Sequence, residues 1–271
     1  MAEGAEEPRG AGATEYAYGR DALQKLDFWR SKVSTPAPLV VFVHGGGWKR
    51  GDKRNATGTA KVMHMLEQGY AFASVNYRLV PDANVEQQAA DVATALAWVR
   101  GNAARLGIDP GRIVLMGHSA GAHLVALVGT DPGYLRAAGL SPSHIRGIIA
   151  LDGACYDVPR QMVEGGRFMR ATYVQAFGED PARQRALSPT FHAAAPNAPA
   201  FLIPHVDRAD GKAQSEALAA ALGRAGTSVE VRAFSGTGLR GHMEINRSLG
   251  DPDYPATPVV DAWLARVFAA N

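Results

Sequence analysis

Short apolar runs alternate with segments of helical periodicity along most of the 271-residue chain, and this alternation constrains the fold more than any other feature. Parallel strands buried on both faces form short apolar runs, and the helices that connect them lie between these runs. The predicted strands are 25–29 (antiparallel), 39–44, 71–77, 112–117, 148–151, 200–206 and 228–234. The predicted helices are 57–68, 85–106, 118–129, 212–225 and 258–269. The sequence therefore predicts an α/β fold with a mostly parallel central sheet flanked by helices.

One segment, 153–197, breaks the alternation. So long an excursion between two strands predicts a small helical cap or a binding loop. Its larger apolar side chains are expected mainly on a buried helix face: Tyr156, Met162, Phe168, Met169, Tyr173 and Phe177. Since no repeat or low-complexity linker divides the chain, we expect one domain over 1–271, with a flexible N-terminus at about 1–15 and a cap-like insertion at about 153–197.

Composition narrows the class of protein. Apolar residues make up 46% and charged residues 20%, as in soluble globular proteins, and the net charge of +2 argues against a nucleic-acid partner. Cys155 is the single cysteine, so no internal disulfide can form, and no Cys/His spacing indicates a metal site. No apolar run approaches the roughly 20 residues that a membrane span needs. The N-terminus does not resemble a signal peptide, so a cytoplasmic location is expected for the chain as written, or a secreted or periplasmic one if a leader was removed.

The motif Gly117-His118-Ser119-Ala120-Gly121 stands directly after an apolar run and directly before a helical segment. This is the G-x-S-x-G pattern in a strand–turn–helix context. Its small residues let strand and helix approach closely and leave the serine oxygen exposed at the sheet edge, near a helix N-terminus that favours negative charge. We therefore predict Ser119 as a nucleophile.

A glycine run, His44-Gly45-Gly46-Gly47-Trp48, follows the apolar core of the predicted strand 39–44. Glycines let backbone N–H groups reach an anionic oxygen without an intervening side chain. The simplest alternative is a flexible turn, and the run does not fit the phosphate-binding patterns G-x-x-x-x-G-K-[ST] or G-x-G-x-x-G. The run therefore predicts an oxyanion hole.

A serine nucleophile needs a base, and the base needs an orienting carboxylate. In the chain order typical of this arrangement the acid follows the serine and the histidine comes last. His242 is the last of eight histidines and follows the glycine-rich segment 236–241, which is predicted as a loop at the sheet edge. We predict His242 as the general base, with His205 as its competitor.

Three aspartates are candidates for the acid. Asp210 is favoured, because a side chain a few residues beyond the end of strand 200–206 can turn back toward His242. Asp207 lies nearer the strand, where an ion pair with Arg208 or a turn cap is the simpler role. Asp152 ranks third, because it follows the preceding strand rather than the strand from which the acid is expected.

At these residues the chain resembles the α/β-hydrolase superfamily, and within it the esterase/lipase group with H-G-G-G-W and G-H-S-A-G motifs. The feruloyl-esterase-like carboxylesterases and the kynurenine formamidase-like hydrolases look most similar. The likeness covers most of the chain and includes Asn76-Tyr77-Arg78-Leu79, Asp109-Pro110-Gly111-Arg112-Ile113 and Gly241-His242-Met243-Glu244-Ile245-Asn246. Many relatives carry the acid in an H-G-x-x-D loop, from which this chain departs: counting from the strand end favours Asp210, and counting back from Gln214-Ser215 favours Asp207.

The resemblance implies a triad of Ser119, His242 and an aspartate, with oxyanion N–H groups from Gly46, Gly47 and Ala120. The leading expectation is a serine carboxylesterase that cleaves esters of small or medium acyl groups through an acyl-serine. The alternatives are an amidase of the formamidase type and a non-catalytic binding module on the same fold. We expect no cofactor and no metal, a small-molecule ester as substrate, and a monomer or homodimer.

Overall fold

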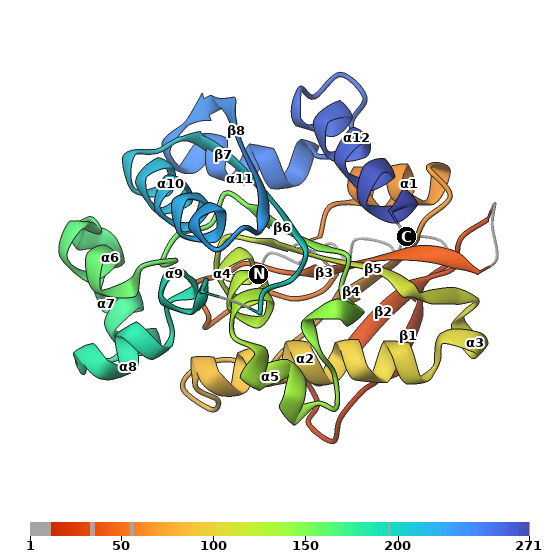
Figure 1. Ribbon diagram of the computed structural model, residues 1–271, viewed down its shortest axis with the longest axis horizontal. Coiled ribbons are helices and arrows are strands. Elements are labelled where there is room, and N and C mark those ends of the chain that lie inside the picture. Colours follow the sequence, from red (N-terminus) through yellow and green to blue (C-terminus); the bar gives the residue numbers. More distant parts are fainter. Residues whose placement is uncertain (1–11, 33–35, 55–56, 195, 271) are drawn as a thin grey trace, which may run out of the picture.

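The computed structural model describes residues 12–32, 36–54, 57–194 and 196–270 (Figure 1). Its central feature is an eight-stranded sheet with the order β1-β2-β4-β3-β5-β6-β7-β8. The first two strands pair antiparallel, β2 also pairs antiparallel with β4, and the remaining pairs are parallel. The strands are β1 Thr14–Ala17, β2 Lys25–Trp29, β3 Ala37–Val43, β4 Ala71–Val75, β5 Ile108–His118, β6 Gly147–Leu151, β7 Ala200–Asp207 and β8 Ser228–Thr237. The predicted α/β fold with a mostly parallel sheet is confirmed.

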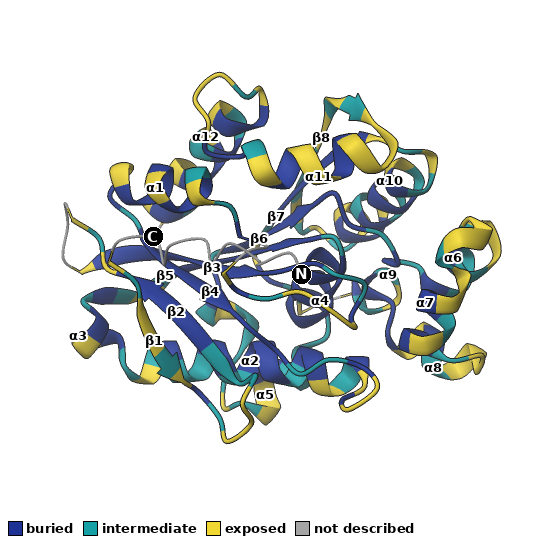
Figure 2. Ribbon diagram, turned by 180° about the vertical axis from the view of Figure 1, so that it is seen from behind, coloured by how far each residue is buried: buried dark blue, intermediate teal, exposed yellow. Residues whose placement is uncertain are grey.

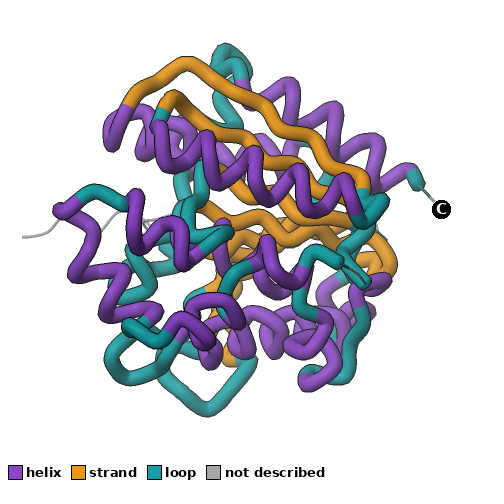
Figure 3. The backbone as a smooth tube through the Cα atoms, turned by 60° about the vertical axis from the view of Figure 1, so that its left-hand side comes forward, coloured by secondary structure: helices purple, strands orange, loops and turns teal. Residues whose placement is uncertain are grey.

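Helices cover both faces of the sheet, and Figure 3 shows the strands enclosed between them. They are α1 Thr59–Glu67, α2 Val85–Gly101, α3 Ala103–Leu106, α4 Ala120–Thr130, α5 Pro132–Ala137, α6 Val158–Glu164, α7 Arg167–Phe177, α8 Pro181–Ala186, α9 Pro189–His192, α10 Ala209–Arg224, α11 Gly238–Ser248 and α12 Ala256–Ala269. A short 3₁₀ turn, Pro142–His144, precedes β6.

The apolar strand runs divide between two cores, because successive side chains of a strand point to opposite faces. Val41 and Leu115 belong to the core under α2, α4 and α10, whereas Phe42 and Met116 belong to the core under α1, α11 and α12. All seven residues of β3 are buried, and Figure 2 shows the burial of the central strands. Burial on both faces explains why these strands form continuous apolar runs in the sequence.

Three local differences from the sequence prediction stand out. The predicted helix 85–106 ends at Gly101, and a separate short helix, α3, follows it. The short, mostly exposed edge strand β1 has no apolar run to reveal it, and its first two residues lie in the stretch that was expected to be flexible. Residues 1–11 of that stretch lie outside the described residues.

The third difference concerns the segment 236–241, which was predicted as a loop. Here the chain passes from β8 directly into α11, so that His242 lies on a helix. Gly236 and Gly238 take φ values of 124° and 53°, which other residues rarely adopt. The segment has G-x-G-x-x-G spacing at a helix start, but the described chain continues into another helix, α12, instead of the returning strand of a dinucleotide-binding unit.

Four helices, α6 to α9, fill the insertion between β6 and β7. Three of them, α6, α7 and α8, project from one end of the molecule (Figures 1 and 3). Tyr173 and Phe177 of α7 are buried as expected for a helix face, whereas Phe168 at its start is 91% exposed. We refer to α6–α9 as the cap.

Candidate active site

Ser119 lies in a sharp turn between β5 and α4. Its backbone has φ 57° and ψ −120°, a strained conformation for a residue with a side chain. A side chain on Gly117 would collide with the backbone of Gly121, and one on Gly121 would collide with the carbonyl of Val43. The two glycines of the G-x-S-x-G motif are therefore required for the close approach of β5, α4 and the end of β3, as the sequence predicted.

The glycine turn after β3 lies directly against Ser119. A Cβ on Gly45 would stand 2.9 Å from the Cβ of Ser119. Gly46 and Gly47 have φ values of 128° and 62°, and within the described chain no group accepts a hydrogen bond from either of their N–H groups. Ala120 is the first residue of α4, where N–H groups have no partner inside the helix. The structure thus brings unpaired donors of the turn to the side of Ser119.

Trp48 anchors this glycine turn to the cap. Its ring makes edge contacts with Phe177 and Tyr173 of α7, at centroid distances of 4.7 and 6.3 Å. Its indole N–H donates to Nδ1 of His123 over 3.3 Å, and Nε2 of His123 donates to the carbonyl of Leu187 over 2.8 Å. Burial lowers the pKa of His123 to about 4, which fits this neutral imidazole. Helix α7 therefore supports the loop that carries the unpaired N–H groups.

His242 reaches the same sheet edge from α11. Its ring centroid lies 4.4 Å from that of His118, the residue before Ser119. Nε2 of His118 donates to the backbone carbonyl of His242 over 2.8 Å, which fixes the first half of α11 to the end of β5. Burial, followed by the charges of His242, Lys61 and Arg208, holds the pKa of His118 well below its usual value, so its ring is neutral. His205, the competing base, instead donates from Nδ1 to the carbonyl of Val206.

The carboxylate that meets His242 is Asp152, and the structure does not bring Asp210 to the imidazole. Nδ1 of His242 lies 2.6 Å from Oδ2 of Asp152, which directly follows β6 and is fully buried. Asp210, on the first turn of α10, lies 3.5 Å from Nε of Arg208 and accepts a hydrogen bond from Gln161 of the cap. Asp207 is exposed at the end of β7. The structure does not match the preference for Asp210, because its carboxylate contacts Arg208 and Gln161 rather than His242.

An ionised Asp152 favours one position for the proton of the imidazole. A carboxylate only accepts hydrogen bonds, so Nδ1 donates to Asp152 and a neutral ring keeps its lone pair on Nε2. The second carboxylate oxygen, Oδ1, accepts from the N–H of Val206 over 3.0 Å. Burial acts to raise the pKa of Asp152, but the hydrogen bond from His242 and the charge of Arg208 outweigh it, and this pKa is lowered.

One sequence signal pointed to Asp152. It stands directly after an apolar strand run, as His44 and His118 do, and its strand is the neighbour of β5 in the sheet. The order serine, aspartate, histidine along the chain holds for Asp152 as well as for Asp210. The chain order therefore could not distinguish the two aspartates, whereas the position of β6 beside β5 in the sheet could.

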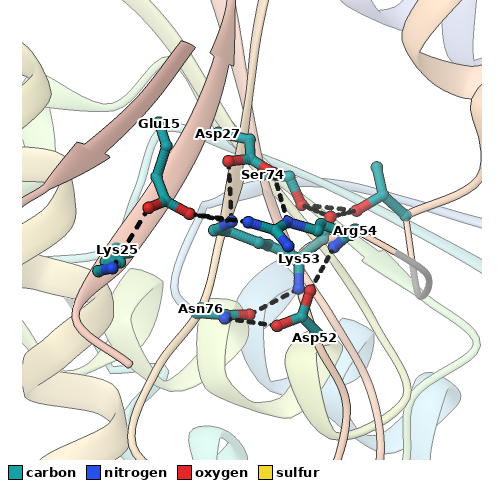
Figure 4. Close-up of polar contacts among 9 residues, drawn as sticks. Glu15, Lys25, Asp27, Asp52, Lys53, Arg54, Ser74 and Asn76 are labelled. Atoms are coloured by element: carbon teal, nitrogen blue, oxygen red, sulfur yellow. Dashed lines mark hydrogen bonds and ion pairs between the residues drawn. The ribbon is translucent and has the colours of Figure 1, made fainter. Parts of the chain in front are cut away.

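A buried polar network holds the segment that follows the glycine turn (Figure 4). Nζ of Lys53, which is 2% exposed, lies 2.8 Å from Asp27 of β2 and 2.9 Å from Glu15 of β1. The N–H of Lys53 donates to Asn76 over 2.6 Å, and Asn76 in turn donates to Asp52 over 2.8 Å. The hydrogen bond from Lys53 is the largest influence on Glu15 and lowers its pKa to about 2. The network ties residues 52–54 to the edge strands.

We expect Lys53→Met to lower the free energy of unfolding by about 3 kcal/mol, because the buried carboxylate of Asp27 loses its close cation and keeps only Arg54, whose Nε lies 3.9 Å away. The matched control is Lys25→Met, which removes an exposed partner of Glu15 and should cost less than about 1 kcal/mol. Urea unfolding of the three proteins, with an unchanged m-value, measures both changes. Equal losses in the two variants would contradict a buried role for Lys53.

In the described part of the chain, His, Cys, Asp and Glu side chains form no group of three or more that could hold a metal ion. No helix found there is both long enough and apolar enough to span a bilayer.

The fold is that of an α/β hydrolase, with Ser119, His242 and Asp152 at one edge of its sheet. Within this class the chain belongs to the BD-FAE family, whose family profile matches residues 26–222. It is similar to esterase LipC of Mycobacterium tuberculosis, with 34% identity over 201 residues that make up 70% of this chain and 49% of LipC. It is also similar to esterase LipQ of the same organism, with 33% identity over 78% of this chain and 52% of LipQ. The chain thus spans about half the length of these curated relatives.

Solved structures agree on the fold. Esterase 2 of Thermogutta terrifontis with propionate bound superimposes with a TM-score of 0.75 and 26% identity, covering 97% of this chain and 98% of that one. Esterase B of Lactobacillus rhamnosus superimposes with a TM-score of 0.76 and 23% identity, covering 97% of this chain and 87% of that one.

Proposed function

We propose that this chain is a serine carboxylesterase that cleaves esters of small or medium acyl groups. Ser119 is the nucleophile, His242 the general base, and Asp152 the acid that orients His242. The N–H groups of Gly46, Gly47 and Ala120 form the oxyanion hole.

One observation carries this proposal: the strained serine, the His242–Asp152 pair and the unpaired glycine N–H groups gather at one edge of the sheet. A binding module would not need a serine held at φ 57° or a buried carboxylate on an imidazole. The esterases among the relatives support the reaction class, and the propionate bound to the Thermogutta enzyme supports a short acyl group.

The reaction proceeds in two steps. Nε2 of His242 takes the proton of Ser119 as Oγ attacks the ester carbonyl carbon, and the carbonyl electron pair moves to the oxygen. The oxyanion accepts hydrogen bonds from the glycine turn and α4, each worth about 3 kcal/mol. The alcohol then leaves with the proton from His242. A water molecule, deprotonated by His242, attacks the acyl-serine in the same way and releases the acid.

The test compares p-nitrophenyl acetate, butyrate and octanoate with N-formylkynurenine. We expect ester turnover that falls with acyl length and exceeds formamide turnover. A fluorophosphonate probe should add one adduct on Ser119, which peptide mass spectrometry can locate. Dominant formamide turnover would make the chain an amidase with the same triad. Absence of both turnover and adduct would refute a hydrolase and favour a binding module.

A further inference from the structure

Arg208 lies beside the His242–Asp152 pair but takes no part in the reaction steps above. It joins the end of β7 to the start of α10, and its side chain is 15% exposed. Its Nη1 atom lies 3.3 Å from Oδ2 of Asp152 and 2.6 Å from Nδ1 of His242. The guanidinium therefore faces both members of the pair.

The arginine is held in this position from its other side. Asp210 lies 3.5 Å from its Nε, and Gln161 of α6 donates to the same carboxylate over 3.3 Å. A Cβ on Gly211 would stand 3.3 Å from Nη2 of Arg208, so the guanidinium lies against a residue without a side chain. The position of Arg208 thus depends on α10 and on the cap.

Asp152 and Arg208 meet at Nδ1 of His242. Nδ1 lies 2.6 Å from Oδ2 of Asp152 and 2.6 Å from Nη1 of Arg208, whereas Nη1 and Oδ2 form an ion pair 3.3 Å apart. If Nδ1 carries its proton, it donates to Asp152, and Arg208 is the counter-ion of the carboxylate. If Nδ1 lacks the proton, it accepts a hydrogen bond from Arg208 and the proton is on Nε2. Nε2 then has no lone pair with which to take the proton of Ser119. An ionised Asp152 favours the first arrangement, because a carboxylate can only accept from Nδ1, whereas a protonated carboxyl group could donate to it.

We propose that Arg208 is a positioning residue that keeps Asp152 ionised and sets the lowest pH at which His242 acts as a base. The inference rests on the proposed esterase function. The cation stabilises the buried carboxylate and repels a second proton on the imidazole. Both effects extend activity toward acidic pH.

Among the described residues, Arg208 is the only lysine or arginine paired with Asp152. His118 is neutral, and burial, as the largest influence, raises the pKa of Tyr156 out of the physiological range and that of Tyr254 to about 12. Nζ of Lys61 donates instead to the carbonyl of Thr57 and to Oδ1 of Asn246, and burial lowers its pKa. The carboxylate of Glu244, on the same helix as His242, is of the opposite sign and exposed. The charged and titratable groups around the pair, among the described residues, are Arg208 with its partner Asp210, His118, Tyr156, Tyr254, Lys61 and Glu244.

The experiment is the pH profile of kcat/KM for p-nitrophenyl butyrate. We expect Arg208→Met to move the acidic limb of this profile to a pH about one unit higher. At pH values below the limb, kcat/KM should then fall about ten-fold, whereas its value on the alkaline plateau should change much less. Arg208→Lys keeps the charge and should keep the limb near its wild-type position while losing plateau activity, because lysine cannot make the two-sided contact. The matched control is Arg224→Met, at the exposed far end of α10.

A loss of activity that is uniform across pH, with the limb unmoved, would overturn the inference and leave Arg208 a packing role. An equal shift in Arg208→Lys would overturn it too, because the charge would then be irrelevant. If Arg208→Met fails to fold, Arg208→Gln provides the same comparison. Failure of the esterase proposal itself is distinguishable, because the wild type would then show neither turnover nor a Ser119 adduct.

Discussion

Ser119→Ala is expected to lower kcat on p-nitrophenyl butyrate by about 10⁶-fold, the scale seen when a serine hydrolase loses its nucleophile. Alanine has no oxygen with which to form the acyl-enzyme. The substitution removes one atom from a half-buried side chain, so the turn and its positive φ should persist. Burst and steady-state kinetics measure the loss, and circular dichroism checks the fold.

The control for this substitution is Ser143→Ala, which alters an exposed serine in the 3₁₀ turn before β6. It should turn over substrate at the wild-type rate. Substantial turnover by Ser119→Ala, above the level that a trace contaminant could explain, would remove Ser119 from the mechanism and the proposed function with it.

Asp152→Asn should cost about 10⁴-fold in kcat, as replacing the acid of a serine triad by its amide does elsewhere. The contacts of Asp152 explain the size of the effect. Val206 donates to Oδ1, so the amide oxygen stays there and the NH₂ group faces Nδ1 of His242. Nδ1 must then accept, the imidazole proton moves to Nε2, and the base can no longer deprotonate Ser119.

Asp210→Asn provides the comparison, because the two substitutions make the same chemical change at the two candidate acids. It loosens the hold on Arg208 and should cost less than about ten-fold, since no catalytic group loses its charge partner. A larger loss in Asp210→Asn than in Asp152→Asn would reverse the assignment and restore the aspartate that the sequence favoured.

Local features of the site were predictable from the sequence, and features that depend on packing between distant segments were not. Ser119 and the glycine turn are defined by a strand, a tight turn and the residues within it, and both turns have positive φ values and close backbone approaches. The partner of His242 depends on which strand ends lie beside each other, and that information is spread over the whole sheet. Asp152 directly follows one apolar strand run and Asp210 lies a few residues beyond another, and the choice between them required the sheet order.

The prediction of secondary structure shows the same division between local features and features that depend on packing. The buried central strands were found because they are apolar on both faces, whereas β1 is short and mostly exposed and gives no such signal. Three glycines made 236–241 look like a loop. The buried side chains of α11, among them His242 and Ile245, stabilise the helix through contacts with other segments.

The contact of α7 with the glycine turn has a consequence for how the specificity of this enzyme can evolve. A Cβ on Gly47 would stand 3.0 Å from Thr172 of α7, and Trp48 lies against Phe177. A helix of the cap is therefore also the support of the proposed oxyanion donors. Substitutions in α7 that change substrate preference should show epistasis with the glycine turn. Grafting a cap from a relative without its matching turn should therefore lower the turnover rate as well as the selectivity.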